Sequence, residues 1–205
     1  RTLPDARLQV APLPTVEQIQ LALINADYQT GPLQADVMQA VIARPAYWAF
    51  CWGSGLALAR WLLQNPHVVA GKRVADVGCG CGIGAIAAKM AGAKKVVACD
   101  NDQDALLSAR INAELNNVSL AFADDVARLE NDFDLILMAD VLYDKSNYLL
   151  LQMAKSLTQT IIVADSRVQS IEDTDFTIFH RSEGLTYPNI GEFDEFRHVR
   201  FFRAS

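Results

Sequence analysis

From residue 72 onward, short apolar runs alternate with segments whose apolar positions recur at helical spacing. Buried strands are predicted at 73–77, 95–99, 118–122, 133–138 and 160–164. Helices are predicted between them, at 83–91, 102–116 and 148–157. Strands that alternate with helices need crossover connections, so the pattern predicts a parallel sheet with helices on both faces.

The end of the chain has a different pattern. Two apolar segments, 176–180 and 196–202, predict strands with no helix between them. Because consecutive strands without a crossover run antiparallel, these two predict a hairpin added to the parallel sheet. We therefore expect an α/β fold with a doubly wound, mostly parallel seven-stranded sheet whose last strand is antiparallel.

The residues before the first predicted strand are less regular. Residues 1–14 contain three prolines and predict a loose arm, whereas Thr15 as an N-cap and the apolar positions up to Asp27 predict a helix. A second short element, at 36–42, has no decided type, and 56–64 has helical spacing.

An aromatic cluster stands between these segments, made of Tyr47, Trp48, Phe50 and Trp52. So many rings in one short stretch cannot all point to one face of a strand or helix. They form either a plug of the core or a wall of a ligand pocket. We place a domain boundary just before them: residues 1–44 form an N-terminal arm and helical extension that lids a main domain at 45–205.

Composition narrows the class of protein. A chain of 205 residues fits one large domain, and 51% hydrophobic against 20% charged residues excludes a disordered chain. The net charge of −6 argues against general nucleic-acid binding, and no apolar run approaches the ~20 residues of a membrane span. The four cysteines do not make a disulfide scaffold, and the three scattered histidines indicate no metal site. We therefore expect a reducing setting, the cytoplasm or an organelle matrix.

The most informative motif is a glycine series, Gly78, Gly80 and Gly82, between a predicted strand and a predicted helix. Glycines there let the backbone turn tightly and approach a ligand near the helix N-terminus. Asp100 ends the next strand, where a carboxylate can accept both ribose hydroxyls. The pattern predicts a nucleotide site, with tight turns and no ligand as the alternative.

Two kinds of nucleotide remain open. The spacing Gly80-x-Gly82-x-x-Ala85 fits a dinucleotide fingerprint, which would make the chain an oxidoreductase or a regulatory module. Asp76, however, would repel a pyrophosphate beside its cradle. S-adenosylmethionine, which carries an amino group and a sulfonium, fits better. The acidic residues then have partners: the amino group for Asp76, the ribose for Asp100, and the adenine ring for Asp125 with Val126.

The series from Asp76 through the glycines to Asp100, Asp125 and the run 133–136 resembles the seven-stranded class I S-adenosylmethionine-dependent methyltransferases. The resemblance covers about residues 45–203. It implies a Rossmann-like fold, S-adenosylmethionine as cofactor and S-adenosylhomocysteine as product. The cofactor contacts that it implies are Trp52, Asp76, Gly78, Gly80, Gly82, Asp100, Asn101, Asp125, Val126 and Ala139.

A second motif narrows the resemblance. Asp140-Val141-Leu142-Tyr143 matches the Asp-x-x-Tyr motif of a group of protein lysine methyltransferases. Together with the run 45–55, it is similar to the lysine methyltransferases of the electron-transfer flavoprotein β subunit and their bacterial relatives. Relatives that methylate a ribosomal protein share much of it. An Asn-Pro-Pro-Tyr motif, typical of members that methylate amide or base nitrogens, is absent, which disfavours glutamine and adenine as targets.

The narrower resemblance implies that the chain methylates a lysine side chain of a protein substrate. Our hypothesis is that Asp140 captures and orients the amine, and that Tyr143 supports it by hydrogen bonding or forms the channel wall. Asp144 and Asp165 are weaker candidates for the same acidic mouth, with Arg167 as a partner of Asp165. The alternatives are a helix cap or salt bridge for Asp140, packing for Tyr143, a small-molecule N- or O-methyltransferase, and a fold that binds without turnover.

Overall fold

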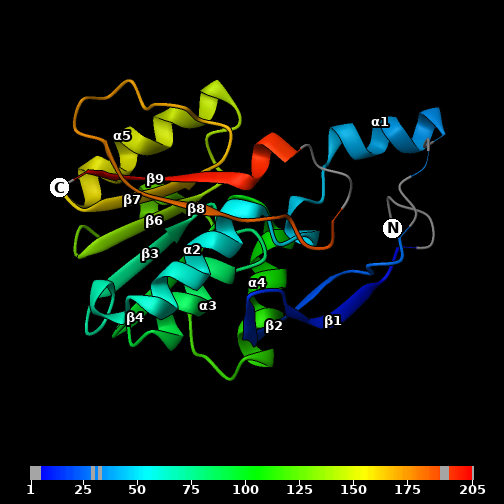
Figure 1. Ribbon diagram of the computed structural model, residues 1–205, viewed down its shortest axis with the longest axis horizontal. Helices are drawn as coiled ribbons and strands as arrows, with labels where there is room; N and C mark the ends of the chain where they lie inside the picture. Colours follow the sequence, from blue (N-terminus) through cyan, green and yellow to red (C-terminus); the bar gives the residue numbers. More distant parts are fainter. Residues whose placement is uncertain (1–5, 29–30, 32–33, 190–193, 205) are drawn as a thin grey trace.

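Five parallel strands form the larger part of one sheet, whose strand order is β5-β4-β3-β6-β7-β9-β8 (Figure 1). The computed structural model describes residues 6–28, 31, 34–189 and 194–204. The parallel strands are β3 Arg73–Val77, β4 Lys95–Cys99, β5 Ala121–Ala123, β6 Leu135–Ala139 and β7 Ile161–Asp165. The two remaining strands, β8 Thr177–Glu183 and β9 His198–Ala204, pair antiparallel, and β9 also pairs antiparallel with β7. The predicted α/β fold with an antiparallel last strand is confirmed.

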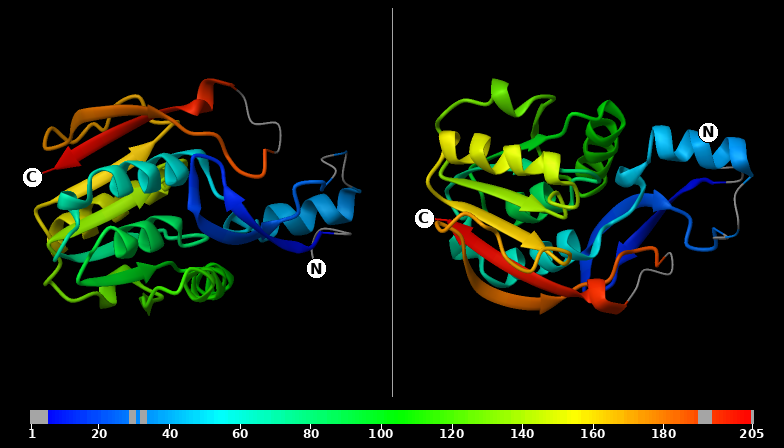
Figure 2. Two further views of the ribbon diagram at one scale, coloured as in Figure 1. Left: turned by 60° about the horizontal axis from the view of Figure 1, so that its bottom comes forward. Right: turned by 90° about the horizontal axis from the view of Figure 1, so that it is seen from above.

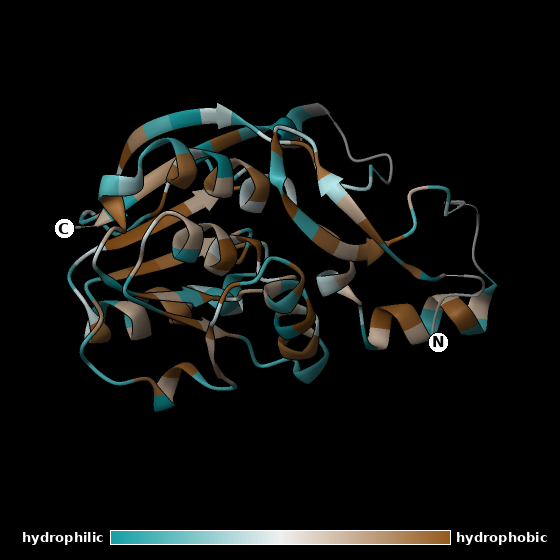
Figure 3. Cartoon of the chain, turned by 90° about the horizontal axis from the view of Figure 1, so that it is seen from below, coloured by the Kyte–Doolittle hydropathy of each residue, from teal (hydrophilic) through white to brown (hydrophobic). Residues whose placement is uncertain are grey.

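Helices cover both faces of this sheet. α2 Gly53–Gln64, α3 Ile83–Met90 and α4 Gln103–Leu115 lie on one face, and α5 Tyr148–Leu157 lies on the other (Figures 1 and 2). Alternate strand residues divide between the two layers. In β6, Leu135 and Leu137 pack on the side of α2 and α3, and Ile136 and Met138 pack on the side of α5. The central strands are therefore apolar along most of their length (Figure 3).

Single-turn helices lie in the loops between these elements. They are η1 Tyr47–Ala49, η2 Pro66–Val68, η3 Val126–Arg128, η4 Lys145–Asn147 and η5 Asp194–Arg197. In the part of the chain that the structure describes, no helix is long and apolar enough to cross a membrane.

The helix predicted from Thr15 to Asp27 is wrong. β1 Leu8–Leu13 and β2 Val16–Ile24 form an antiparallel hairpin, and Thr15 lies in its turn with a φ of 64°. The apolar residues of β2 follow a period of two, with Ile19, Leu21 and Leu23 buried on one side. That alternation is the strand signal, and it outweighs the apparent N-cap.

The loose arm predicted at 1–14 is wrong from Leu8 onward, and residues 1–5 lie outside the described residues. The element of undecided type at 36–42 is a helix, α1 Ala35–Ala43. The helical extension therefore reduces to α1, and a hairpin precedes it (Figure 1).

Two asparagines of α4 attach the hairpin to the main fold. The Asn112 side chain accepts a hydrogen bond from the Ala22 N–H at 2.7 Å and donates one to the Cys81 carbonyl at 2.9 Å. The Asn116 side chain accepts from the Gln20 N–H and donates to the Gln20 carbonyl. Buried hairpin side chains also share one core with α2 and α3. The division of the chain at residue 44 stays a prediction.

Candidate active site

The loop between β3 and α3 carries the glycine series. Gly78, Gly80 and Gly82 have φ values of 73°, 50° and 84°, in the left-handed region that other residues avoid. At Gly78 a side chain is also excluded by space, because a Cβ would lie 2.3 Å from the Val141 side chain. The loop therefore brings backbone, rather than side chains, to the edge of the sheet.

Asp100 holds this loop from the end of β4. One of its carboxylate oxygens accepts a hydrogen bond from the Gly80 N–H at 2.9 Å, and the other accepts from the Asp102 N–H at 3.0 Å. Burial raises the pKa of the Asp100 carboxyl above its ordinary value. A carboxylate has about four acceptor sites, more than the backbone N–H groups around Asp100 occupy, so it can still accept a hydrogen bond from a ligand.

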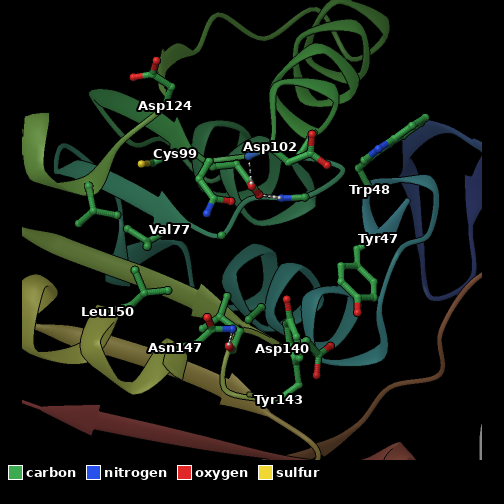
Figure 4. A pocket seen from close by; sticks show the side chains of 18 of the residues that line it. Tyr47, Trp48, Val77, Cys99, Asp102, Asp124, Asp140, Tyr143, Asn147 and Leu150 are labelled. Carbon is green, nitrogen blue, oxygen red and sulfur yellow. Dashed lines mark hydrogen bonds between the residues drawn. The ribbon is translucent and has the colours of Figure 1, made fainter. Parts of the chain in front are cut away.

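One pocket of about 720 Å³ lies beyond the carboxyl ends of the parallel strands, the usual ligand position in such sheets. Of the site residues predicted from the sequence, Asp76 and Gly82 do not line it, nor do the weaker candidates Asp144 and Asp165; all the others do. Figure 4 shows Asp140, Tyr143 and Tyr47 along one side of the pocket, and Asp102, Cys99 and Asp124 along the other. Sequence reasoning did not assign the further lining residues Val77, Cys99, Asp102, Ala105, Arg128, Val141, Asn147, Leu150 and Met153.

Asp76 points away from the pocket, which corrects its predicted contact with the cofactor's amino group. Its side chain shares a strand face with Val74, on the side of α3, and its carboxylate accepts a hydrogen bond from the Ala85 N–H at 2.8 Å. Only 2% of the residue is exposed, and this burial raises the pKa of the carboxyl to about 7. Gly82 is likewise set back, as the N-cap residue of α3.

Asp76→Asn tests this burial through the pH dependence of stability. The carboxyl has a pKa of about 7 in the folded chain and an ordinary value of 3.8 in the unfolded chain. As the pH rises, the unfolded chain therefore loses this proton at a lower pH than the folded chain does. The wild type therefore loses stability as the pH rises from about 4 to about 7. Asparagine keeps an acceptor for the Ala85 N–H and has no charge. In urea unfolding, the stability of Asp76→Asn relative to the wild type should rise by about 2.5 kcal/mol between about pH 5 and pH 8. A gain that is equal at the two pH values would contradict the burial.

Asp140 follows β6 and has a strained backbone, with a φ of 52°. The N–H of Ser54, at the start of α2, donates to one carboxylate oxygen at 2.9 Å, and the Ser54 hydroxyl donates to the other at 2.6 Å. The pKa of the Asp140 carboxyl is raised to about 6, mainly by burial and also by the Asp165 charge, while the hydrogen bonds from Ser54 and the Arg167 charge oppose the rise. Asp140 thus binds the N-terminus of α2 and lines the pocket at the same time.

Three members of the aromatic cluster form a wall of the pocket, namely Tyr47, Trp48 and Trp52. The Trp52 indole N–H donates to the Tyr47 carbonyl at 2.8 Å, and the Tyr47 ring lies 5.4 Å from the Tyr143 ring. Tyr143 is 53% exposed, so its phenol ring stands at the mouth rather than in the core. The arrangement supports the pocket-wall interpretation of the cluster for these three residues.

The weaker candidates, Asp144 and Asp165, and the predicted partner Arg167 lie in different environments. Asp144 is exposed, caps η4 and does not line the pocket, and Asp165 is fully buried below it. Arg167 meets Asp165 through its backbone N–H, but its side chain lies 3.6 Å from an Asp140 oxygen and lines the pocket. Among the described residues, no group of His, Cys, Asp and Glu could hold a metal ion.

Comparison with known proteins shows to which family the chain belongs. The model of the ribosomal protein L11 methyltransferase family (PrmA) matches residues 59–170, which is more than half of the sequence. The chain belongs to this family. The predicted resemblance to S-adenosylmethionine-dependent methyltransferases is thereby confirmed.

Individual relatives agree with the family. The chain is 48% identical over 103 residues to the electron transfer flavoprotein beta subunit lysine methyltransferase of Danio rerio, a match that covers 49% of this chain and 40% of that protein. The match thus spans about two fifths of the length of this relative and of its Homo sapiens counterpart. This match confirms the predicted similarity to that group.

Solved structures share the fold. The ribosomal protein L11 methylase from Lactobacillus delbrueckii subsp. bulgaricus superposes with a TM-score of 0.55 and 25% identity, over 73% of this chain and 78% of that one. Magnesium protoporphyrin IX methyltransferase from Synechocystis PCC 6803, solved with bound S-adenosylmethionine, has a TM-score of 0.55 and 22% identity, over 85% and 86% of the two chains. At that identity the second structure supports the fold alone.

Proposed function

We propose that this chain is an S-adenosylmethionine-dependent methyltransferase that acts on a lysine side chain of a protein. One observation supports this most strongly. The segment Asp140 to Tyr143 and the loop held by Asp100 line the same pocket. A nucleotide-binding edge and an acidic, aromatic amine-binding edge thus face each other across one cavity. The curated relatives are named for the same chemistry.

The residues present fit S-adenosylmethionine. Asp100 has free lone pairs for the ribose hydroxyls, and Asp125 with Val126 lies at the pocket edge where an adenine ring would rest. A pocket of about 720 Å³ falls in the range of small-ligand sites. When bound, S-adenosylmethionine supplies a methyl group activated by the positive sulfur. The product is then S-adenosylhomocysteine.

The chain's own residues position the amine. The Tyr47 and Tyr143 rings contact each other in the pocket lining. In this proposal they form the wall of an aromatic channel along which the apolar stem of the lysine lies, and the Asp140 carboxylate at its inner end accepts a hydrogen bond from the amine. Ser54 fixes that carboxylate through two hydrogen bonds, so the amine is held in one orientation. The lysine nitrogen, once deprotonated, forms the bond to the methyl carbon, and the electron pair of the broken carbon–sulfur bond stays on sulfur.

The partner we propose is a protein that presents a lysine, either the electron transfer flavoprotein β subunit or a ribosomal protein. The relatives' names support the first and the family's name supports the second. Acidic residues at the pocket, Asp100, Asp102, Asp124, Asp125 and Asp140, favour a basic side chain. We propose a reducing compartment, the cytoplasm or an organelle matrix, as the setting.

Incubation with methyl-labelled S-adenosylmethionine and a cell lysate tests the proposal. We expect label in a protein band, because the aromatic channel admits a side chain presented from outside. Label confined to the small-molecule fraction would favour the small-molecule alternative and overturn the proposal. Calorimetry with S-adenosylmethionine and NAD, run in parallel, should show heat for the first ligand only. Binding of S-adenosylmethionine with no transfer to any acceptor would indicate a fold that binds without turnover.

A further inference from the structure

The acidic mouth raises a problem for lysine chemistry. A lysine amine has an ordinary pKa of ~10.4 and must lose a proton before its nitrogen can attack. Asp165 ends β7, and Asp140 directly follows the neighbouring strand β6. A negative charge at either position raises the pKa of an ammonium group bound beside it. Two unopposed carboxylates would capture a lysine and then hold it in its unreactive, protonated form.

Arg167 carries a positive charge close to Asp140 that opposes them. It follows β7, where the Arg167 and Val168 N–H groups both donate to one Asp165 oxygen, at 2.8 and 3.0 Å. These two hydrogen bonds fix the turn that carries the side chain. The guanidinium then lies 3.6 Å from an Asp140 oxygen, and 29% of the side chain is exposed.

Two aromatic rings hold the guanidinium beside the pocket. Its central carbon lies 4.6 Å from the Phe196 ring centroid and 5.8 Å from the Trp52 ring centroid, both within reach of a cation–π contact. Trp52 belongs to the pocket wall, so Arg167 occupies the same side of the pocket as Asp140. A guanidinium is a permanent positive charge, so its effect does not vanish at any working pH.

We infer that Arg167 offsets the Asp140 charge, so that the carboxylate orients the substrate amine without holding it protonated. The inference rests on the proposed function. Titratable groups that act on Asp140 from neighbouring elements include Asp165 and the buried Cys51 thiol, and Tyr47 and Tyr143 line the same pocket. An amine bonded to Asp140 lies within about 7 Å of the guanidinium, since a hydrogen bond adds ~2.9 Å to the contact. At that distance, and with a dielectric constant between that of a protein surface and that of bulk water, a unit charge shifts a pKa by about one unit.

Arg167 therefore acts as a positioning and charge-setting residue, and its removal should change the pH dependence of transfer. Without the guanidinium, the ammonium of the substrate and the carboxyl of Asp140 both lose their protons at higher pH. The acid side of the rate profile should then move upward by about one pH unit. At neutral pH this is a fall in kcat of about tenfold, which recovers as the pH rises. KM for the protein substrate should not increase, because a cation that repels the ammonium has been removed.

The experiment compares wild type, Arg167→Gln and Arg167→Lys at saturating S-adenosylmethionine, with single-turnover rates measured from about pH 6 to pH 10. We expect Arg167→Gln to show the displaced profile, and Arg167→Lys, which keeps the charge, to follow the wild type more closely. An Arg167→Gln rate that falls by one constant factor at every pH would show a merely structural role and would overturn the inference.

A second measurement does not depend on turnover. Carbon-13 NMR of the Asp140 carboxyl in the cofactor-free protein should show its pKa rising in Arg167→Gln and staying near the wild-type value in Arg167→Lys. An Asp140 titration that is the same in all three proteins overturns the inference even where methyl transfer is intact. If the wild type methylates no lysine at any pH, the proposed function fails first, and the inference falls with it.

Discussion

Asp140→Asn should lower methyl transfer about 100-fold while leaving the affinity for S-adenosylmethionine within several-fold. The carboxylate is the charged acceptor at the inner end of the aromatic channel, and asparagine presents an amide there that cannot attract a basic side chain in the same way. Asparagine tolerates a φ of 52° and can still accept from the Ser54 N–H, so the fold should survive. Single-turnover transfer and calorimetry, run on the same preparation, measure the two effects.

Asp144→Asn is the matched control for this prediction. Asp144 stands four residues further along, caps η4 through the Ser146 N–H at 2.8 Å and does not line the pocket. Its replacement removes the same charge near the mouth, and transfer should stay within about threefold of the wild type. Parental transfer by Asp140→Asn would show that the role assigned to Asp140 is wrong.

Asp100→Ala should weaken S-adenosylmethionine binding by about 100-fold or more. Two ribose hydroxyls lose a charged acceptor, at ~1.5–3 kcal/mol each, and the Gly80 N–H loses the partner that fixes the glycine loop. Calorimetric titration of the purified protein measures the change directly. Asp104→Asn, which removes an exposed carboxylate paired with Arg44 outside the pocket, is the control and should bind as the wild type does. Unchanged affinity in Asp100→Ala would overturn the ribose assignment.

The sequence predicted the sheet well because its physical signal is local. A strand such as β6 is buried on both faces, so it is a continuous apolar run in the sequence, and β3 departs from that pattern inside the strand only at Asp76. The residues at the ligand-binding edge of the sheet could be predicted for the same reason. Asp100 and Asp140 stand at or just after strand ends, and parallel strands bring their carboxyl ends to one edge.

The errors arose where one residue pattern allowed two readings. In β2, the apolar positions at 19, 21, 23 and 24 fit the start of a helix loosely and one face of a strand well. The hairpin could be recognised only together with its partner strand β1, which was not predicted as a strand. Asp76 was judged by its chemistry and its place near the glycines. Side chains alternate between the two faces of a strand, so Asp76 shares a face with Val74. Counting from Val74 would have predicted that the Asp76 side chain points toward α3.

Other residues could not be assigned from local pattern. Ser54 and Asp140 stand 86 positions apart, and their hydrogen bonds exist only because α2 begins beside the end of β6. Arg167 was placed with Asp165, its neighbour in sequence, whereas the side chain reaches across to Asp140 on the next strand. Such pairings depend on tertiary arrangement rather than on spacing along the chain.

The central claim is that the pocket transfers a methyl group to a protein lysine. The most direct measurement incubates the purified chain and S-adenosylmethionine with two purified proteins, the electron transfer flavoprotein β subunit and ribosomal protein L11, and maps methylated residues by peptide mass spectrometry. We predict methylation of a lysine side chain in one of them by the wild type, and its loss with Asp140→Asn. Unmodified lysines in both proteins, with S-adenosylmethionine bound and the methyl group transferred to a small molecule instead, would contradict the account.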